Sequence, residues 1–278
     1  MVKVLKTIEE ESNDDDLILT GFSNLDKLIT GIKNKSLVVV AARPGMGMVS
    51  FGLTTCLNIV KEYNKKILYI SFDTSSEFLI RRLISIDTGI NAHKIRNRSL
   101  DFEEWHQLEK SVLNLNELSG FYIYDSCFSL EEALQTIRCN IEDLNIDLVI
   151  IEPLNFSKEV LSSEEPNKFI TGLKEISKNN DVSIMLQVHL LSNIETREGV
   201  PRPQYSDVDE VNPVINLVAD LVILLWRPAY YHIVEDEEGN NITKLAELII
   251  AKNKYGDLGE AKLEFNEKIS TFRNWESN

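Results

Sequence analysis

Residues 43–50 are the part of the sequence whose types and spacing best suit chemistry on a ligand. They follow a continuous apolar run over residues 37–42 and precede a helix-forming stretch. A buried strand, a glycine-containing turn and a helix, in this order, direct backbone N–H groups and the positive end of the helix toward one anion. The order predicts a phosphate-binding loop. Its candidate residues are Arg43, Pro44, Gly45, Met46, Gly47, Met48, Val49 and Ser50.

The loop departs from the usual phosphate-binding sequence at two positions. The usual form is G-x-x-x-x-G-K-[ST], in which the lysine contacts the β- and γ-phosphates and the hydroxyl residue binds Mg²⁺. Met48 and Val49 occupy these positions here, so the charge and the oxygen are both missing. Protein electrostatics carries most of the catalysis of phosphoryl transfer, and loss of one such group typically costs about 10²–10³ in rate. The sequence therefore predicts slow or absent hydrolysis.

Polar residues end three other apolar runs of the chain. These residues are Asp73, Glu152 and Gln187. The runs are continuously apolar and alternate with helical patterns, which predicts a mostly parallel sheet with helices on both faces. Ligands of such sheets bind at the carboxyl edge of the strands, so we expect the three side chains near the loop.

The remaining elements complete an α/β domain. Helices are predicted to start at Thr74–Glu77 and at Ser129, and to cover residues 101–120 and 167–181. Residues 189–210 lack a period and carry Gly and Pro, which predicts a long loop. Strands are predicted over residues 216–227 and 244–254, and residues 261–275 are predicted to close the chain as a β-hairpin. We expect an acidic N-terminal tail over residues 1–16 and one domain over residues 17–278.

Composition limits the classes of function. The 278 residues carry a formal net charge of −15, which argues against strong nucleic-acid binding by a lone subunit. The three cysteines, Cys56, Cys127 and Cys139, are odd in number and widely spaced, as in proteins with reduced thiols. The sequence shows no signal peptide and no apolar stretch of the roughly 18 residues that a membrane span needs. We expect a cytoplasmic protein without a membrane partner. The four histidines show no metal-ligand spacing.

Eight segments in order resemble the C-terminal ATPase domain of DnaB-type replicative helicases. They include TGFSNLDKLITGI, VVVAARPGMG, ISFDTSSEFLIRRL, DLVIIEPL, ADLVILLWRP and IIAKNKYGDLGEAKLEFN, and the resemblance runs from Ile18 to Trp275. It implies a RecA-like fold, ATP and Mg²⁺ as cofactors, a hexameric ring with ATP sites between subunits, and single-stranded DNA in the central channel. We expect the family's N-terminal helical domain, which binds primase, to be absent.

The resemblance assigns expected roles to the strand-end residues. It places the water-activating carboxylate at Asp73 and the second metal-binding carboxylate at Glu152, each of which differs from the family's residue by one methylene. It places the relay glutamine at Gln187. Ser50, next to Val49, is a displaced candidate for the magnesium hydroxyl.

The resemblance also implies contacts with a neighbouring subunit and with DNA. The basic pair donated to the neighbour's phosphates falls on Lys252 and Lys254, so a lysine replaces the arginine finger. Arg197 and Arg202 fall in the region of the DNA-contacting loops, although acidic neighbours make a solvated loop the slightly favoured interpretation. For Arg43, contact with a phosphate and pairing with a carboxylate are equally favoured.

Three hypotheses for function follow. The preferred one is a degenerate helicase-type protein of DNA replication that binds ATP weakly, hydrolyses little or none, and acts through subunit contacts or an unidentified replication partner. The second is an active helicase that uses Ser50 and Glu152 on the metal and Lys252 or Lys254 on phosphate. The third is an assembly or adaptor protein that needs no nucleotide. The family forms hexamers, but a weakened site is also compatible with a monomer or dimer.

Overall fold

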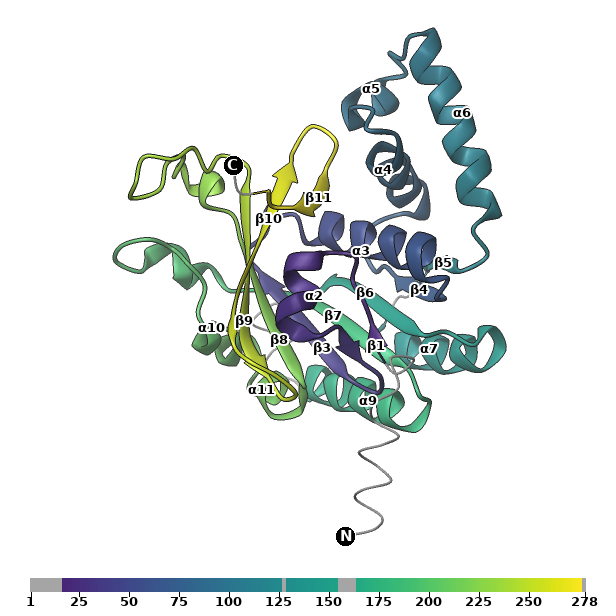
Figure 1. The fold of residues 1–278 in the computed structure, drawn as a ribbon. Helices are drawn as coiled ribbons and strands as arrows, with labels where there is room; N and C mark the ends of the chain where they lie inside the picture. The colour runs from purple at the N-terminus through teal and green to yellow at the C-terminus, as the bar shows by residue number, and fades with distance from the viewer. Residues whose placement is uncertain (1–16, 127–128, 155–163, 277–278) are drawn as a thin grey trace.

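The computed structural model describes residues 17–126, 129–154 and 164–276 and shows an α/β fold built on a large, mostly parallel sheet (Figure 1). The predicted acidic tail over residues 1–16 and the thiol of Cys127 lie outside the described residues. Of the other cysteines, Cys56 is buried and Cys139 is exposed, and both are free thiols. Among the described helices, none has the length and apolar character that a bilayer crossing requires.

Nine strands of the described chain form the main sheet, with β3 at its centre. The order is β11-β10-β9-β8-β3-β7-β6-β4-β5. The six strands from β8 to β5 are parallel, and β9, β10 and β11 extend the sheet antiparallel. The strands are β3 (Leu37–Ala42), β4 (Ile67–Ile70), β5 (Phe121–Tyr124), β6 (Leu148–Leu154), β7 (Ser183–His189), β8 (Leu221–Trp226), β9 (Leu245–Asn253), β10 (Gly259–Asn266) and β11 (Thr271–Asn274). A separate ribbon pairs β1 (Leu17–Ile18) with β2 (Ile32–Lys33).

Helices cover both faces of the sheet, as the sequence predicts (Figure 1). One face packs against α2 (Ser23–Ile29), α3 (Met48–Tyr63) and α4 (Ser76–Thr88), with α5 (Ala92–Asn97) and α6 (Phe102–Glu117) outside α4. The other face packs against α7 (Leu130–Leu144), α9 (Glu165–Asn179), α10 (Tyr205–Val211) and α11 (Pro213–Val218). Short 3₁₀ turns are η2 (Ser192–Thr196) and η3 (Pro228–Tyr231).

Strand β3 is apolar along its whole length because both of its faces are buried. Val38 and Val40 point into the core that contains α3, whereas Val39 and Ala41 point into the core that contains α9. All six residues of the strand are buried. A strand that is covered on both faces has no polar side, so this arrangement explains the absence of alternation in the sequence.

Two predicted boundaries near the carboxyl half are wrong. Residues 189–210, predicted as a loop, contain η2 and helix α10, whose start is closed by a capping box between Gln204 and Asp207. The strand predicted over residues 216–227 begins only at Leu221. Its first residues belong to α11, which starts at Pro213 with Asn212 as its cap. Local side-chain caps stabilise these helices of only six or seven residues, which are too short to show a hydrophobic period.

Candidate phosphate-binding site

The predicted strand, loop and helix are present at the carboxyl end of β3. Gly45 and Gly47 adopt φ values of 86° and 96°, a region that glycine enters without strain. A Cβ atom on Gly45 would lie 2.6 Å from the Tyr230 ring, so the turn also requires the absence of a side chain. Helix α3 starts at Met48, and no side chain of the described chain caps it. Its first N–H groups are therefore available to an anion.

The loop borders a cavity of about 470 Å³ at this edge of the sheet. Both predicted carboxylates reach it, Glu152 from β6 and Asp73 from the segment that follows β4. The loop residues that line it are Arg43, Pro44, Gly45, Gly47, Met48, Val49 and Ser50. Met46 is the exception among the predicted loop residues, because its side chain is 1% exposed and packs in the core beneath the loop.

The lysine and hydroxyl positions of the loop present apolar groups. Met48 is 3% exposed, so most of its thioether packs into the core beside α3. Val49 is partly buried and packs against the same core. The loop therefore keeps the backbone geometry of a phosphate site, while neither side chain offers a charge or an oxygen.

Ser50 does not present a free hydroxyl to the cavity. Its side chain is buried, and its Oγ accepts a hydrogen bond of 3.2 Å from Nη1 of Arg82 on helix α4. The oxygen predicted to replace the magnesium-binding hydroxyl thus faces a guanidinium cation.

Glu152 lines the cavity but is hydrogen-bonded to the segment that follows β4. Ser71 donates its hydroxyl to one carboxylate oxygen, and Thr74 donates its hydroxyl to the other. The carboxylate therefore fixes the end of β6 to the connection between β4 and α4. Asp73 is exposed at the rim of the cavity, which suits contact with water or a ligand.

The residues around the loop do not fit a nucleotide-bound Mg²⁺ ion. Mg²⁺ needs oxygen ligands in near-octahedral geometry. Val49 has none, the Ser50 oxygen faces Arg82, and both oxygens of Glu152 already accept hydrogen bonds, so the exposed carboxylate of Asp73 stands at the rim without a second ligand from the loop. Across the ranges that the structure describes, no group of three or more His, Cys, Asp or Glu residues has metal-binding geometry.

Gln187 lies beneath the first turn of α3 and does not line the cavity. Its Nε2 donates to the backbone oxygen of Met48 at 2.9 Å, and its Oε1 is buried without a hydrogen-bond partner among the described residues. Gly52 gives it room, because a Cβ there would lie 2.9 Å from Nε2. Gln187 thus contacts the backbone of the first turn of α3, and its relay role stays a prediction.

Arg43 lines the cavity but is paired with a carboxylate. Its Nε donates to Glu195 at 3.0 Å, and its Nη1 donates to the backbone oxygen of Leu190 at 2.6 Å. Of the two interpretations of Arg43, the structure shows the carboxylate pair.

Sequence reasoning missed several residues of the cavity. Arg227 follows β8, donates to the Gly45 oxygen at 3.3 Å and lies 3.9 Å from the centre of the Phe265 ring. The strand-end rule that identified Asp73 applies equally to Arg227. Arg82 has no such signal, because it lies in the middle of a helix and only the tertiary packing brings it to the loop.

His189, at the end of β7, also lines the cavity. Burial lowers the pKa of its imidazole, so the ring is neutral at pH 7 and adds no charge for a phosphate.

Lys252 and Lys254 lie at the end of the sheet where the parallel strands begin, opposite the loop, which lies where they finish. Lys252 is near the end of β9 and Lys254 follows β9, both next to the start of β8. Lys252 donates to the Asn216 backbone oxygen at 2.8 Å, and Lys254 donates to Asp220 at 3.3 Å. One molecule therefore does not bring these lysines to its own cavity.

Arg197 and Arg202 are both held in ion pairs within the chain. Arg197 pairs with the buried Asp207. Arg202 pairs with Glu247 and Glu260, each at 2.7–2.8 Å. Contact of these arginines with DNA stays a prediction, and in this structure both guanidinium groups are paired with carboxylates.

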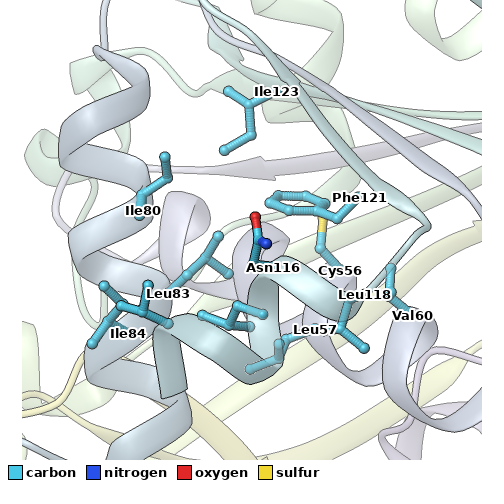
Figure 2. A pocket seen from close by; sticks show the side chains of 12 residues that line it. Cys56, Leu57, Val60, Ile80, Leu83, Ile84, Asn116, Leu118, Phe121 and Ile123 are labelled. Carbon is cyan, nitrogen blue, oxygen red and sulfur yellow. The ribbon is translucent and has the colours of Figure 1, made fainter. Parts of the chain in front are cut away.

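A second cavity, of about 330 Å³, lies among α3, α4, α6 and β5 (Figure 2). Its lining is apolar apart from the thiol of Cys56 and the amide of Asn116. Figure 2 shows Ile80, Leu83 and Ile84 of α4 reaching into it. This cavity has no group suited to phosphate and shares no lining residue with the cavity at the loop.

Known proteins resemble this chain over nearly its whole length. It is 33% identical over 263 residues to a probable replicative DNA helicase from Trieres chinensis, covering 91% of this chain and 56% of the relative. It is 29% identical to the replicative DNA helicase DnaB of Geobacillus stearothermophilus, covering 99% of this chain and 61% of the relative. The chain thus spans somewhat more than half the length of these curated relatives.

Solved structures match the fold of this chain. One of them, described as an ATPase domain, superimposes with a TM-score of 0.85 at 25% identity, covering 99% of this chain and 98% of that one. A DnaB-like replicative helicase, solved in a study of its interactions with primase, superimposes with a TM-score of 0.84 at 24% identity, covering 99% of this chain and 67% of that one. The family model of the DnaB-like helicase C terminal domain matches residues 18–274. The chain therefore belongs to the family of the DnaB-like helicase C-terminal domain.

Proposed function

We propose that this chain acts in DNA replication as a helicase-type domain that binds ATP weakly at the loop of residues 43–50 and hydrolyses it slowly or not at all. One observation carries the proposal. The loop, the helix N-terminus and the cavity have the geometry of a phosphate site, whereas Met48 and Val49 supply neither cation nor metal ligand. The names of the relatives, replicative DNA helicases, support the role in replication.

Binding and hydrolysis depend on different parts of this site. Backbone N–H groups and the helix N-terminus attract phosphate whatever the side chains are. Hydrolysis needs charge stabilisation in the transition state, and two missing groups, at about 10²–10³ each, would remove most of the rate if their effects combined. We therefore expect a site that retains some affinity and has lost turnover.

We further propose that assembly with other copies contributes to the site. Lys252 and Lys254 lie at the edge opposite the loop, so they can contact a nucleotide only on a neighbouring copy. A hexameric ring that surrounds single-stranded DNA is the arrangement that the family suggests, and a monomer or dimer is the expected form without nucleotide. The replication partner is unidentified.

Release of inorganic phosphate from Mg²⁺-ATP, with and without single-stranded DNA, tests the proposal. We expect a rate at or near background, and no change in Asp73→Ala. A DNA-stimulated rate that Asp73→Ala abolishes would instead support the active helicase. Equilibrium binding of ATP by calorimetry completes the test, because no binding at millimolar ATP would support a nucleotide-independent adaptor.

A further inference from the structure

Arg82 differs from the other arginines of the loop cavity in its charge balance. Arg43 pairs with Glu195, and Arg227 lies 3.5 Å from Glu267. Arg82 makes no ion pair with any carboxylate in the part of the chain that the structure describes. Its guanidinium instead donates to the neutral Ser50 oxygen in the first turn of α3. It is thus a cavity-lining cation that is not neutralised by a paired carboxylate.

Helix α4 holds Arg82 in this position. Leu79 and Leu83 of the same helix are buried in the core, and Ile80 and Ile84 border the apolar cavity with Leu83 (Figure 2). These apolar contacts fix the rotation of the helix. Arg82 is consequently presented to the loop cavity, on a different side of α4 from the apolar cavity.

The position of Arg82 carries an electrostatic cost that an anion would remove. Burial lowers the pKa of its guanidinium, which shows that the charged form is partly desolvated, and the charge of Glu152 counteracts this only in part. A phosphate at the N-terminus of α3 would lie beside the guanidinium. Arginine binds phosphate through parallel N–H···O contacts, which are shorter and stronger than neutral hydrogen bonds.

We propose that Arg82 is the phosphate-binding cation of this cavity and that it replaces both the missing loop lysine and Mg²⁺. The ligand is a nucleoside polyphosphate bound without a metal ion. Neutralisation by Arg82 takes the place of the metal because the two loop positions that would hold the cation and the metal, Met48 and Val49, offer Mg²⁺ no oxygen ligand. This inference rests on the proposed nucleotide binding and adds the residue and the metal independence.

Calorimetric titration with ATP in EDTA and in excess MgCl₂ tests the proposal. For the unmodified chain we expect the same affinity in both buffers. Arg82→Met is expected to weaken binding about tenfold or more in both, as loss of one charge-assisted phosphate contact would. Arg81→Met is the matched control and should bind as the unmodified chain does, because Arg81 is a more exposed neighbour that pairs with Glu77.

The outcomes separate this inference from the proposed function. Binding that requires Mg²⁺, or equal binding by Arg82→Met and the unmodified chain, would overturn the role of Arg82 and leave nucleotide binding in place. No binding of ATP by the unmodified chain in either buffer would overturn both.

Two further measurements distinguish phosphate binding from a structural role of Arg82. Without nucleotide, the melting temperature of Arg82→Met should be unchanged or higher, because the variant removes a desolvated charge. Adding Met48→Lys to Arg82→Met should restore affinity, since it returns a cation to the same cavity. A lower melting temperature together with no rescue by lysine would contradict the proposal.

Discussion

Met48 places a neutral thioether where the usual loop has an ammonium group, and we therefore expect it to limit the affinity of the cavity for phosphates. We predict that Met48→Lys tightens ATP binding about tenfold or more, because a charge-assisted hydrogen bond contributes about 1.5–3 kcal/mol. Calorimetry would measure the change, with the apolar substitution Met48→Leu as the control that keeps the side chain neutral. Equal affinity of the two variants would show that the loop does not receive the phosphates.

Asp220 is a buried carboxylate whose ion pairs stabilise the fold in a pH-dependent way. It is 2% exposed, accepts from the Leu37 N–H at 2.9 Å, and pairs with Lys174 and Lys254. Burial alone would raise its pKa, but the hydrogen bonds from Lys174 and Leu37 outweigh burial, so its pKa lies below the ordinary value. The folded pKa is thus lower than the unfolded one. The stabilisation is present above about pH 4 and is lost as the pH falls through the folded pKa.

Asp220→Asn should therefore lower the free energy of unfolding by about 3 kcal/mol at pH 7, because it leaves Lys174 without its counter-ion. Urea denaturation at several pH values would measure this, and the difference from the unmodified chain should shrink in acid. Asp181→Asn, at an exposed surface pair, is the control and should change stability by less than about 1 kcal/mol. Similar losses for the two variants, or a loss independent of pH, would contradict the assignment.

At the scale of elements, the loop between β3 and α3 depends on Gly45. We predict that Gly45→Ala destabilises the fold by about 1–3 kcal/mol, because its φ of 86° is strained for alanine and the Cβ would meet the Tyr230 ring at 2.6 Å. It should also abolish ATP binding by moving the loop.

Gly89→Ala is the matched control for this prediction. Gly89 has a φ of 74° at the end of α4, and no atom lies within 4 Å of an added Cβ. It should cost about 1 kcal/mol through backbone strain alone and leave ATP binding unchanged. Loss of binding in both variants would mean that general stability, and not the loop, controls affinity.

The elements also show what could be predicted from the sequence and what could not. The strands and longer helices were predictable because burial on both faces leaves a continuous apolar run, as in β3, and because long helices carry a period. The residues of α10 and α11 were not, because these helices have only seven and six residues, too few to show a hydrophobic period, although Val208, Val211 and Ile215 pack into the core. Arg82 could not be predicted either, because only the packing of α4 in the folded chain brings its side chain to the loop.

At the scale of the whole molecule, we expect the opposite positions of the loop and of Lys254 to link nucleotide binding to assembly. We predict a monomer or dimer without nucleotide and a larger assembly when ATP is added, because phosphates would bridge the loop of one copy and the lysines of the next. Light scattering after size-exclusion chromatography would measure the mass. Lys254→Ala should reduce the effect of ATP, and a stable hexamer without nucleotide would contradict this link.

Thermal melting of the chain with ATP in EDTA, with Mg²⁺-ATP and without nucleotide is the most direct test of the central claim, which is that the loop still binds phosphate. A ligand at 100 times its Kd adds about 2.7 kcal/mol of stability, which corresponds to a rise of roughly 5 °C or more in Tm for a domain of this size. We predict a clear rise with ATP in both buffers, absent in Gly45→Ala, and no release of inorganic phosphate. An unchanged melting temperature at millimolar ATP would contradict the account and would indicate a scaffold without a nucleotide.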